Sequence, residues 1–274
     1  MLPGPQMNLQ TLPSRRFEIT KREKFVASSA LVAVSFLVIQ FLPVGKIYYW
    51  SIFGFSILVL ACLFWSLEKF SKFKFLILSI LPLTFTVSLT LFVSLLPGHF
   101  LIPVVTSVGF ALVFYSLLLT LNIYNVAAIR TIVLVRAAHS VGFLFGMLSA
   151  FFAFEVIFAL HLSFYLISVL VFLTSFLVAV SVLWSFELEE YISWRVLIYS
   201  LVLALLVAQF SLVFAFWPII PMVAALGAVG AFYVALGLTQ FHFNDRLNSK
   251  TVLEYASVAL VVLILLFLTA RWGG

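Results

Sequence analysis

Long apolar runs dominate the sequence, and short polar or turn-forming segments separate them. A helix needs roughly 20 consecutive apolar residues to cross the hydrocarbon core of a bilayer. The runs that approach or exceed this length are residues 25–41, 48–67, 75–96, 101–121, 137–160, 163–186, 196–216, 222–240 and 251–270. The pattern therefore predicts an all-α fold, a polytopic bundle of nine transmembrane helices that forms a single domain over residues 25–270.

Three segments interrupt this pattern. Residues 1–24 are polar and proline-containing, which predicts a flexible cytoplasmic N-terminal tail. Pro82 lies inside the third run and is expected to break that span. Residues 122–125 are predicted to form a turn, with a helix from Val126 leading into the fifth span. Whether residues 122–140 form an interfacial helix or part of the fifth span stays open.

The composition excludes a soluble globular protein. Hydrophobic residues make up 65% of the chain and charged residues 9%, whereas a soluble domain has about 45–50% and about 25%. The single cysteine, Cys62, excludes an intrachain disulfide. The net charge of +6 would suggest nucleic acid binding in a soluble protein, but no basic stretch here is interleaved with aromatic residues on a polar face. We expect the lipid bilayer, and not nucleic acid, to be the partner.

The lysine and arginine residues predict the orientation of the bundle. Positive residues favour the cytoplasmic side of short loops. With nine spans and a cytoplasmic N-terminus, only Lys46 and Arg271 of the 15 basic residues fall outside. We therefore expect the N-terminus inside and the C-terminus outside, in a cell or cytoplasmic membrane.

An inventory of motifs disfavours an enzyme. The sequence contains no HExxH or GxSxG motif, and every lysine lies outside the apolar runs, where it could not hold a retinal Schiff base. The four histidines lie near the ends of spans and do not form facing pairs for a haem. We expect no catalytic residue, no bound metal and no cofactor.

Glu155 is the most unusual residue within an apolar run. A carboxylate near the centre of a bilayer costs roughly 2–3 kcal/mol or more, and is a candidate functional site by default. At 1.5 Å per residue, Glu155 would lie about 9 Å from the midpoint of the fifth span, toward the outside. It is either a transport or proton-handling group, or a structural side chain that is protonated or bonded near Lys46 or Arg271.

Two stripes of small residues predict close helix packing. Small residues at a spacing of four allow the backbones of membrane helices to approach closely. The two stripes comprise Gly142, Gly146 and Ala150 in the fifth run, and Gly227, Ala231 and Ala235 in the eighth. The first stripe lies almost opposite Glu155 at 100° per residue. We expect packing within the monomer, with oligomer contacts as the alternative.

A polar cluster precedes the fifth span on the predicted cytoplasmic side. It comprises Asn122, Asn125, Arg130, Arg136 and His139. Arginine presents a rigid fork of donors that suits phosphate, and basic pockets between helices can hold lipid headgroups. The competing interpretation is that the arginines pair with the acidic residues of the next cytoplasmic loop, Glu187, Glu189 and Glu190.

These observations support two functional hypotheses. The first is a non-enzymatic membrane component, a scaffold or assembly subunit that works with other membrane proteins. The alternative is a transporter or flippase for an anionic or lipid-linked substrate that uses Glu155 and the cytoplasmic cluster. A conducting path needs polar lining, and the apolar runs supply little of it. The sequence therefore favours the component.

Overall fold

The computed structural model describes residues 20–67, 71–127, 134–189 and 191–270. These residues form nine α-helices and no strand, which confirms the all-α fold. Each helix is long and apolar enough to cross a membrane. The helices are α1 (Lys21–Gln40), α2 (Lys46–Ser66), α3 (Lys72–Ser94), α4 (Leu101–Ala127), α5 (Val135–Ala159), α6 (Phe164–Glu187), α7 (Trp194–Phe216), α8 (Pro221–Phe243) and α9 (Ser249–Thr269).

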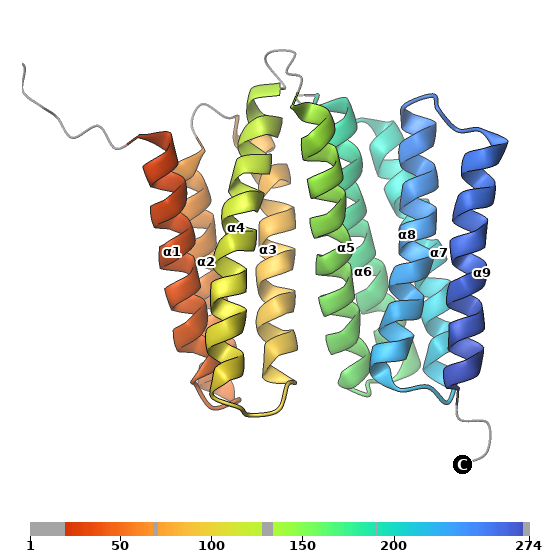
Figure 1. Ribbon diagram of the computed structural model, residues 1–274, viewed down its shortest axis with the longest axis horizontal. Coiled ribbons are helices and arrows are strands. Elements are labelled where there is room, and N and C mark those ends of the chain that lie inside the picture. Colours follow the sequence, from red (N-terminus) through yellow and green to blue (C-terminus); the bar gives the residue numbers. More distant parts are fainter. Residues whose placement is uncertain (1–19, 68–70, 128–133, 190, 271–274) are drawn as a thin grey trace, which may run out of the picture.

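The helices run up and down in one bundle, with α1–α4 on one side and α6–α9 on the other (Figure 1). Helix α5 joins the two sides, because it packs against α3 and α4 as well as against α6 and α8. Helix α9 lies at the edge and packs mainly on α8. Consecutive helices alternate in direction (Figure 1). Because their number is odd among the described residues, α1 begins and α9 ends at opposite ends of the bundle.

One end of the bundle carries nearly all of the described basic residues, and we call it the basic end. Here α1 begins, and here α2 is followed by α3, α4 by α5, α6 by α7 and α8 by α9 (Figure 1). Its described basic residues are Lys21, Arg22, Lys24, Lys72, Lys74, Arg136, Arg195, Arg246 and Lys250. Lys46 lies at the other end, at the start of α2. That the basic end faces the cytoplasm remains a prediction.

Side-chain caps start several helices at this end. Thr20 and Glu23 form a capping box at α1, in which the Glu23 carboxylate accepts a 2.7 Å hydrogen bond from the Thr20 backbone. Helix α1 therefore begins at Lys21, inside the segment assigned above to the tail, of which residues 1–19 lie outside the described residues. At α3, α7 and α9 the side chains of Ser71, Ser193 and Asn248 each accept a hydrogen bond from a backbone N–H of the first turn.

The turn predicted at residues 122–125 is wrong, because α4 continues through this segment to Ala127. Asparagine costs only about 0.7 kcal/mol in a helix interior relative to alanine. Burial of Leu121 and Tyr124 outweighs this cost, and the Tyr124 hydroxyl donates a 2.8 Å hydrogen bond to the Ala138 carbonyl of α5. The lead-in helix predicted from Val126 falls largely on residues 128–133, which lie outside the described residues; α4 ends at Ala127 and α5 begins at Val135.

The break predicted at Pro82 is also absent, and α3 is continuous from Lys72 to Ser94. In a membrane, neighbouring helices and hydroxyl side chains can compensate for the hydrogen bond that proline removes. Pro82 is buried, and so are Leu81 before it and Phe85 one turn after it, so neighbouring helices pack against this part of α3. Packing on both sides therefore keeps this helix intact.

Phenylalanine rings connect the helices of the α1–α4 side to α5. Phe36 of α1 lies 4.7 Å from Phe110 of α4 between ring centroids, and Phe110 lies 6.1 Å from Phe85 of α3. Phe85 in turn lies 6.0 Å from Phe145 of α5. All four side chains are buried. The aromatic residues in these apolar runs thus form a continuous core.

Candidate functional site

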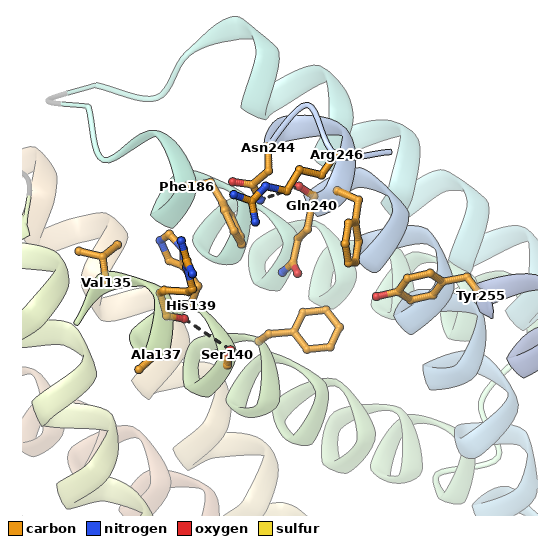
Figure 2. A pocket seen from close by; sticks show the side chains of 12 residues that line it. Val135, Ala137, His139, Ser140, Phe186, Gln240, Asn244, Arg246 and Tyr255 are labelled. Atoms are coloured by element: carbon orange, nitrogen blue, oxygen red, sulfur yellow. Dashed lines mark hydrogen bonds between the residues drawn. The ribbon is translucent and has the colours of Figure 1, made fainter. Parts of the chain in front are cut away.

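A cavity of about 1080 Å³ opens at the basic end, between α5, the end of α6, α8 and the start of α9 (Figure 2). We call it the basic cavity. Its lining residues are Val135, Arg136, Ala137, His139, Ser140, Phe143, Phe186, Gln240, Phe241, Asn244, Arg246 and Tyr255. This volume is slightly above the range of about 300–1,000 Å³ that is usual for small-molecule sites.

Two arginines from distant parts of the chain line this cavity. Arg136 comes from the first turn of α5, and Arg246 from the segment between α8 and α9. Among the described residues, no salt bridge joins Arg136 to Glu187 or Glu189, and Glu187 instead accepts a hydrogen bond from the Ser193 hydroxyl. Glu190 lies outside the described residues. The described acidic side chains therefore leave both guanidinium groups available to an anion.

His139 is fixed in the cavity wall by α6. Its Nε2 lies 2.8 Å from the Ser185 carbonyl oxygen, and its ring centroid lies 4.2 Å from that of Phe186. A carbonyl oxygen can only accept, so Nε2 carries the hydrogen and donates. In the neutral ring, Nδ1 then remains an acceptor. The contact holds the beginning of α5 against the end of α6 and shapes one wall of the cavity.

The opposite wall is formed by α8 and α9. The side-chain nitrogen of Asn244 donates to the backbone carbonyl of Gln240 at 2.9 Å. The side-chain nitrogen of Gln240 is buried and has no hydrogen-bond partner among the described residues. Figure 2 shows the amide end of Gln240 and the hydroxyl of Tyr255 directed toward the cavity. A buried donor without a partner is costly, and it suits an acceptor atom of a ligand.

The structure brings together only part of the predicted polar cluster. Arg136 and His139 line the basic cavity, whereas Asn122 and Asn125 do not. Asn125 is buried on α4, and Asn122 is half-buried. Arg130 lies outside the described residues. The sequence analysis missed Gln240, Asn244, Arg246 and Tyr255; the one available signal was that Arg246 falls on the same predicted side of the membrane as Arg136.

Comparison with known proteins places the chain in a family. A family model described as "Protein of unknown function (DUF5656)" matches residues 53–269, which is most of the chain. The chain belongs to the DUF5656 family. No curated protein and no solved structure matches it significantly. All residues that line the basic cavity of this DUF5656 protein lie within the matched segment.

Glu155 lies in a different part of the DUF5656 protein. At 1.5 Å per residue it is about 12 Å from the midpoint of α5 and about 28 Å along the axis from Arg136. Its Oε2 atom is buried and has no hydrogen-bond partner among the described residues, and Arg271 lies outside them. Glu155 and the basic cavity are therefore two separate features, near opposite ends of α5.

The glycines of the first small-residue stripe face neighbouring helices. A Cβ atom on Gly142 would overlap the Tyr124 hydroxyl of α4. A Cβ atom on Gly146 would lie 2.9 Å from Cγ2 of Val182 on α6, and Ala150 is fully buried. These contacts are those expected of a packing surface within the monomer.

The second stripe faces α7 and α9. A Cβ atom on Gly227 would lie 3.0 Å from Cζ of Phe214 and 3.1 Å from the δ-carbons of Leu266. Ala231 and Ala235 are half-buried, and with Gly227 they line an apolar cavity of about 250 Å³ between α7, α8 and α9. This part of the DUF5656 protein is therefore less tightly packed than the first stripe.

Proposed function

We propose that this DUF5656 protein is a non-enzymatic membrane component that binds the phosphate group of an anionic lipid in the basic cavity. The observation that carries the proposal is that Arg136 and Arg246 line one cavity at the basic end. Arginine forms paired hydrogen bonds with phosphate oxygens. Basic pockets between transmembrane helices on the cytoplasmic side are known binding sites for lipid headgroups.

The lining of the cavity suits an amphiphile. The apolar side chains of Phe143, Phe186 and Phe241 lie in the same cavity as the two guanidinium groups. The surrounding helices are long and apolar enough to cross a membrane. A lipid from the surrounding bilayer can place its phosphate at the basic end while its acyl chains remain in the hydrocarbon. Binding of this kind is compatible with a scaffold or assembly subunit that works beside other membrane proteins.

A transporter or flippase for an anionic or lipid-linked substrate is the second candidate. The observation in its favour is the buried, unpartnered carboxylate oxygen of Glu155. A coupled carrier would use this group for a proton or cation while the arginines hold the substrate. Because Glu155 and Arg136 are about 28 Å apart along α5, such a carrier would have to connect two distant sites. Simple headgroup binding needs only the basic cavity.

The proposal is tested by lipid binding to the full-length protein in detergent. The two ligands are dioctanoyl phosphatidylglycerol, which is anionic, and dioctanoyl phosphatidylcholine, which is zwitterionic. We expect the anionic lipid to bind more tightly. Replacing Arg136 and Arg246 together by glutamine should weaken its binding roughly ten- to 100-fold. Each charge-assisted hydrogen bond contributes about 1.5–3 kcal/mol, but solvent screening lowers this contribution because both side chains are exposed.

Arg195→Gln is the matched control, because Arg195 also lies at the basic end but stacks on Phe243, with the guanidinium carbon 4.3 Å from the ring centroid. This variant should bind phosphatidylglycerol as the wild type does. Equal binding of the two lipids by the wild type would refute the proposed function. A loss of affinity in Arg195→Gln as large as that in the double variant would also refute it, since the effect would then come from the surface charge of the whole end.

A further inference from the structure

We propose that the headgroup in the basic cavity carries hydroxyl groups beside its phosphate, as in a glycerol, polyol or sugar phosphodiester. This inference rests on the proposed function and specifies the class of lipid. It derives from two features of the cavity lining: its neutral polar side chains, and the presence of arginines without a carboxylate.

Gln240 is the main evidence. Its buried side-chain nitrogen has no hydrogen-bond partner among the described residues, and its amide end is directed toward the cavity (Figure 2). A carboxamide both donates and accepts hydrogen bonds, whereas phosphate oxygens at neutral pH mainly accept. The unpartnered nitrogen can donate to a phosphate oxygen or to a hydroxyl, but only a hydroxyl can also donate to the amide oxygen, so the whole group matches a hydroxyl.

Other neutral polar groups lie on the same cavity. The Ser140 hydroxyl donates to the Arg136 carbonyl at 3.4 Å, which leaves its oxygen free to accept. The Tyr255 hydroxyl is directed toward the cavity (Figure 2). The side-chain nitrogen of Asn244 donates to the backbone carbonyl of Gln240, which leaves the side-chain oxygen of Asn244 available. Several donor-acceptor groups thus lie beside the two guanidinium groups. A phosphate at neutral pH offers no donor to the Ser140 and Asn244 oxygens, whereas a hydroxyl group does.

The charges of the cavity argue against an amine-bearing headgroup. Among the described lining residues, two are arginines and none carries a carboxylate. A choline, ethanolamine or serine ammonium would therefore meet two like charges in the lining and no carboxylate there, which disfavours its binding. Hydroxyl groups carry no such penalty. The cavity volume of about 1080 Å³ also leaves space for a group larger than a phosphate.

The test compares two lipids that differ only in hydroxyl groups. Dioctanoyl phosphatidylglycerol and dioctanoyl phosphatidylethanol are both phosphodiesters with one negative charge and equal acyl chains. We expect the wild type to bind phosphatidylglycerol roughly three- to tenfold more tightly than phosphatidylethanol. This factor corresponds to the free energy that one or two neutral hydrogen bonds contribute to binding. Gln240→Met keeps the side-chain length and removes the amide, and it should reduce this preference, because the affinity for phosphatidylglycerol falls by a larger factor than the affinity for phosphatidylethanol.

Gln209→Met is the matched control, since Gln209 lies on the exposed surface of α7 and outside the cavity. It should keep the wild-type preference. Equal binding of the two lipids by the wild type would overturn the inference and leave the proposed function standing, and this measurement does not depend on any variant. A preference in Gln240→Met as large as that of the wild type would overturn it as well. If neither anionic lipid bound more tightly than phosphatidylcholine, the proposed function itself would fail.

Discussion

Gly146 allows a quantitative test of how α5 packs within the bundle. Adding a methyl group there would place a carbon 2.9 Å from Cγ2 of Val182 and 3.3 Å from Cγ1 of Val178, both on α6. Gly109, in α4, is the matched control, because a Cβ atom there meets no heavy atom within 4 Å. The same substitution can therefore be made in a crowded and in an open helical position.

The expected effects have opposite signs. In an open helical position, Gly→Ala stabilises by roughly 0.5–1 kcal/mol, because the unfolded chain loses conformational freedom. At Gly146 this gain is opposed by overpacking, which costs about 1–3 kcal/mol. Val182 is β-branched and prefers one rotamer in a helix, so it cannot easily turn aside. We expect Gly109→Ala to stabilise the protein and Gly146→Ala to destabilise it by about 0.5–2 kcal/mol.

The assay is thermal unfolding of the full-length variants in one detergent. A change of 1 kcal/mol shifts Tm by roughly 2–4 °C for a chain near this size. Gly146→Leu should lower Tm further than Gly146→Ala, since it adds three more carbons to the same contact. The reasoning would be refuted if Gly146→Ala were as stable as Gly109→Ala, because α5 and α6 would then be further apart than the structure has them.

Two further predictions concern Glu155 and the orientation of the chain. Glu155→Gln should raise Tm, because an amide costs less to bury than a carboxylate with an unpartnered oxygen, and should leave phosphatidylglycerol binding unchanged. Loss of lipid binding in this variant would contradict the separation of Glu155 from the basic cavity. Reporter fusions between α6 and α7 and between α8 and α9 should report the cytoplasm, and a fusion after Gly274 the opposite side. A cytoplasmic C-terminus would refute the orientation.

The number and approximate bounds of the helices followed from the sequence, because the thickness of a bilayer sets the apolar length of a span. Two of the departures from the sequence analysis depended on tertiary contacts. Helix α4 continues through Asn122 and Asn125, and the Tyr124 hydroxyl reaches the Ala138 carbonyl of α5. Likewise α3 continues through Pro82, which is buried among neighbouring helices. Local propensity is a weak guide where packing supplies more free energy.

The candidate site was visible in the sequence only as residues of suitable chemistry. Arg136 and His139 were identified because they stand close together at the start of an apolar run. Gln240 and Arg246 come more than 100 positions later, and a lone glutamine near the end of an apolar run carries no signal of its own. Only the packing of α8 against α5 places these side chains on one cavity. The sequence determined which residues lie at the basic end, because the apolar lengths set the spans, whereas the contacts between helices decided which of them share a site.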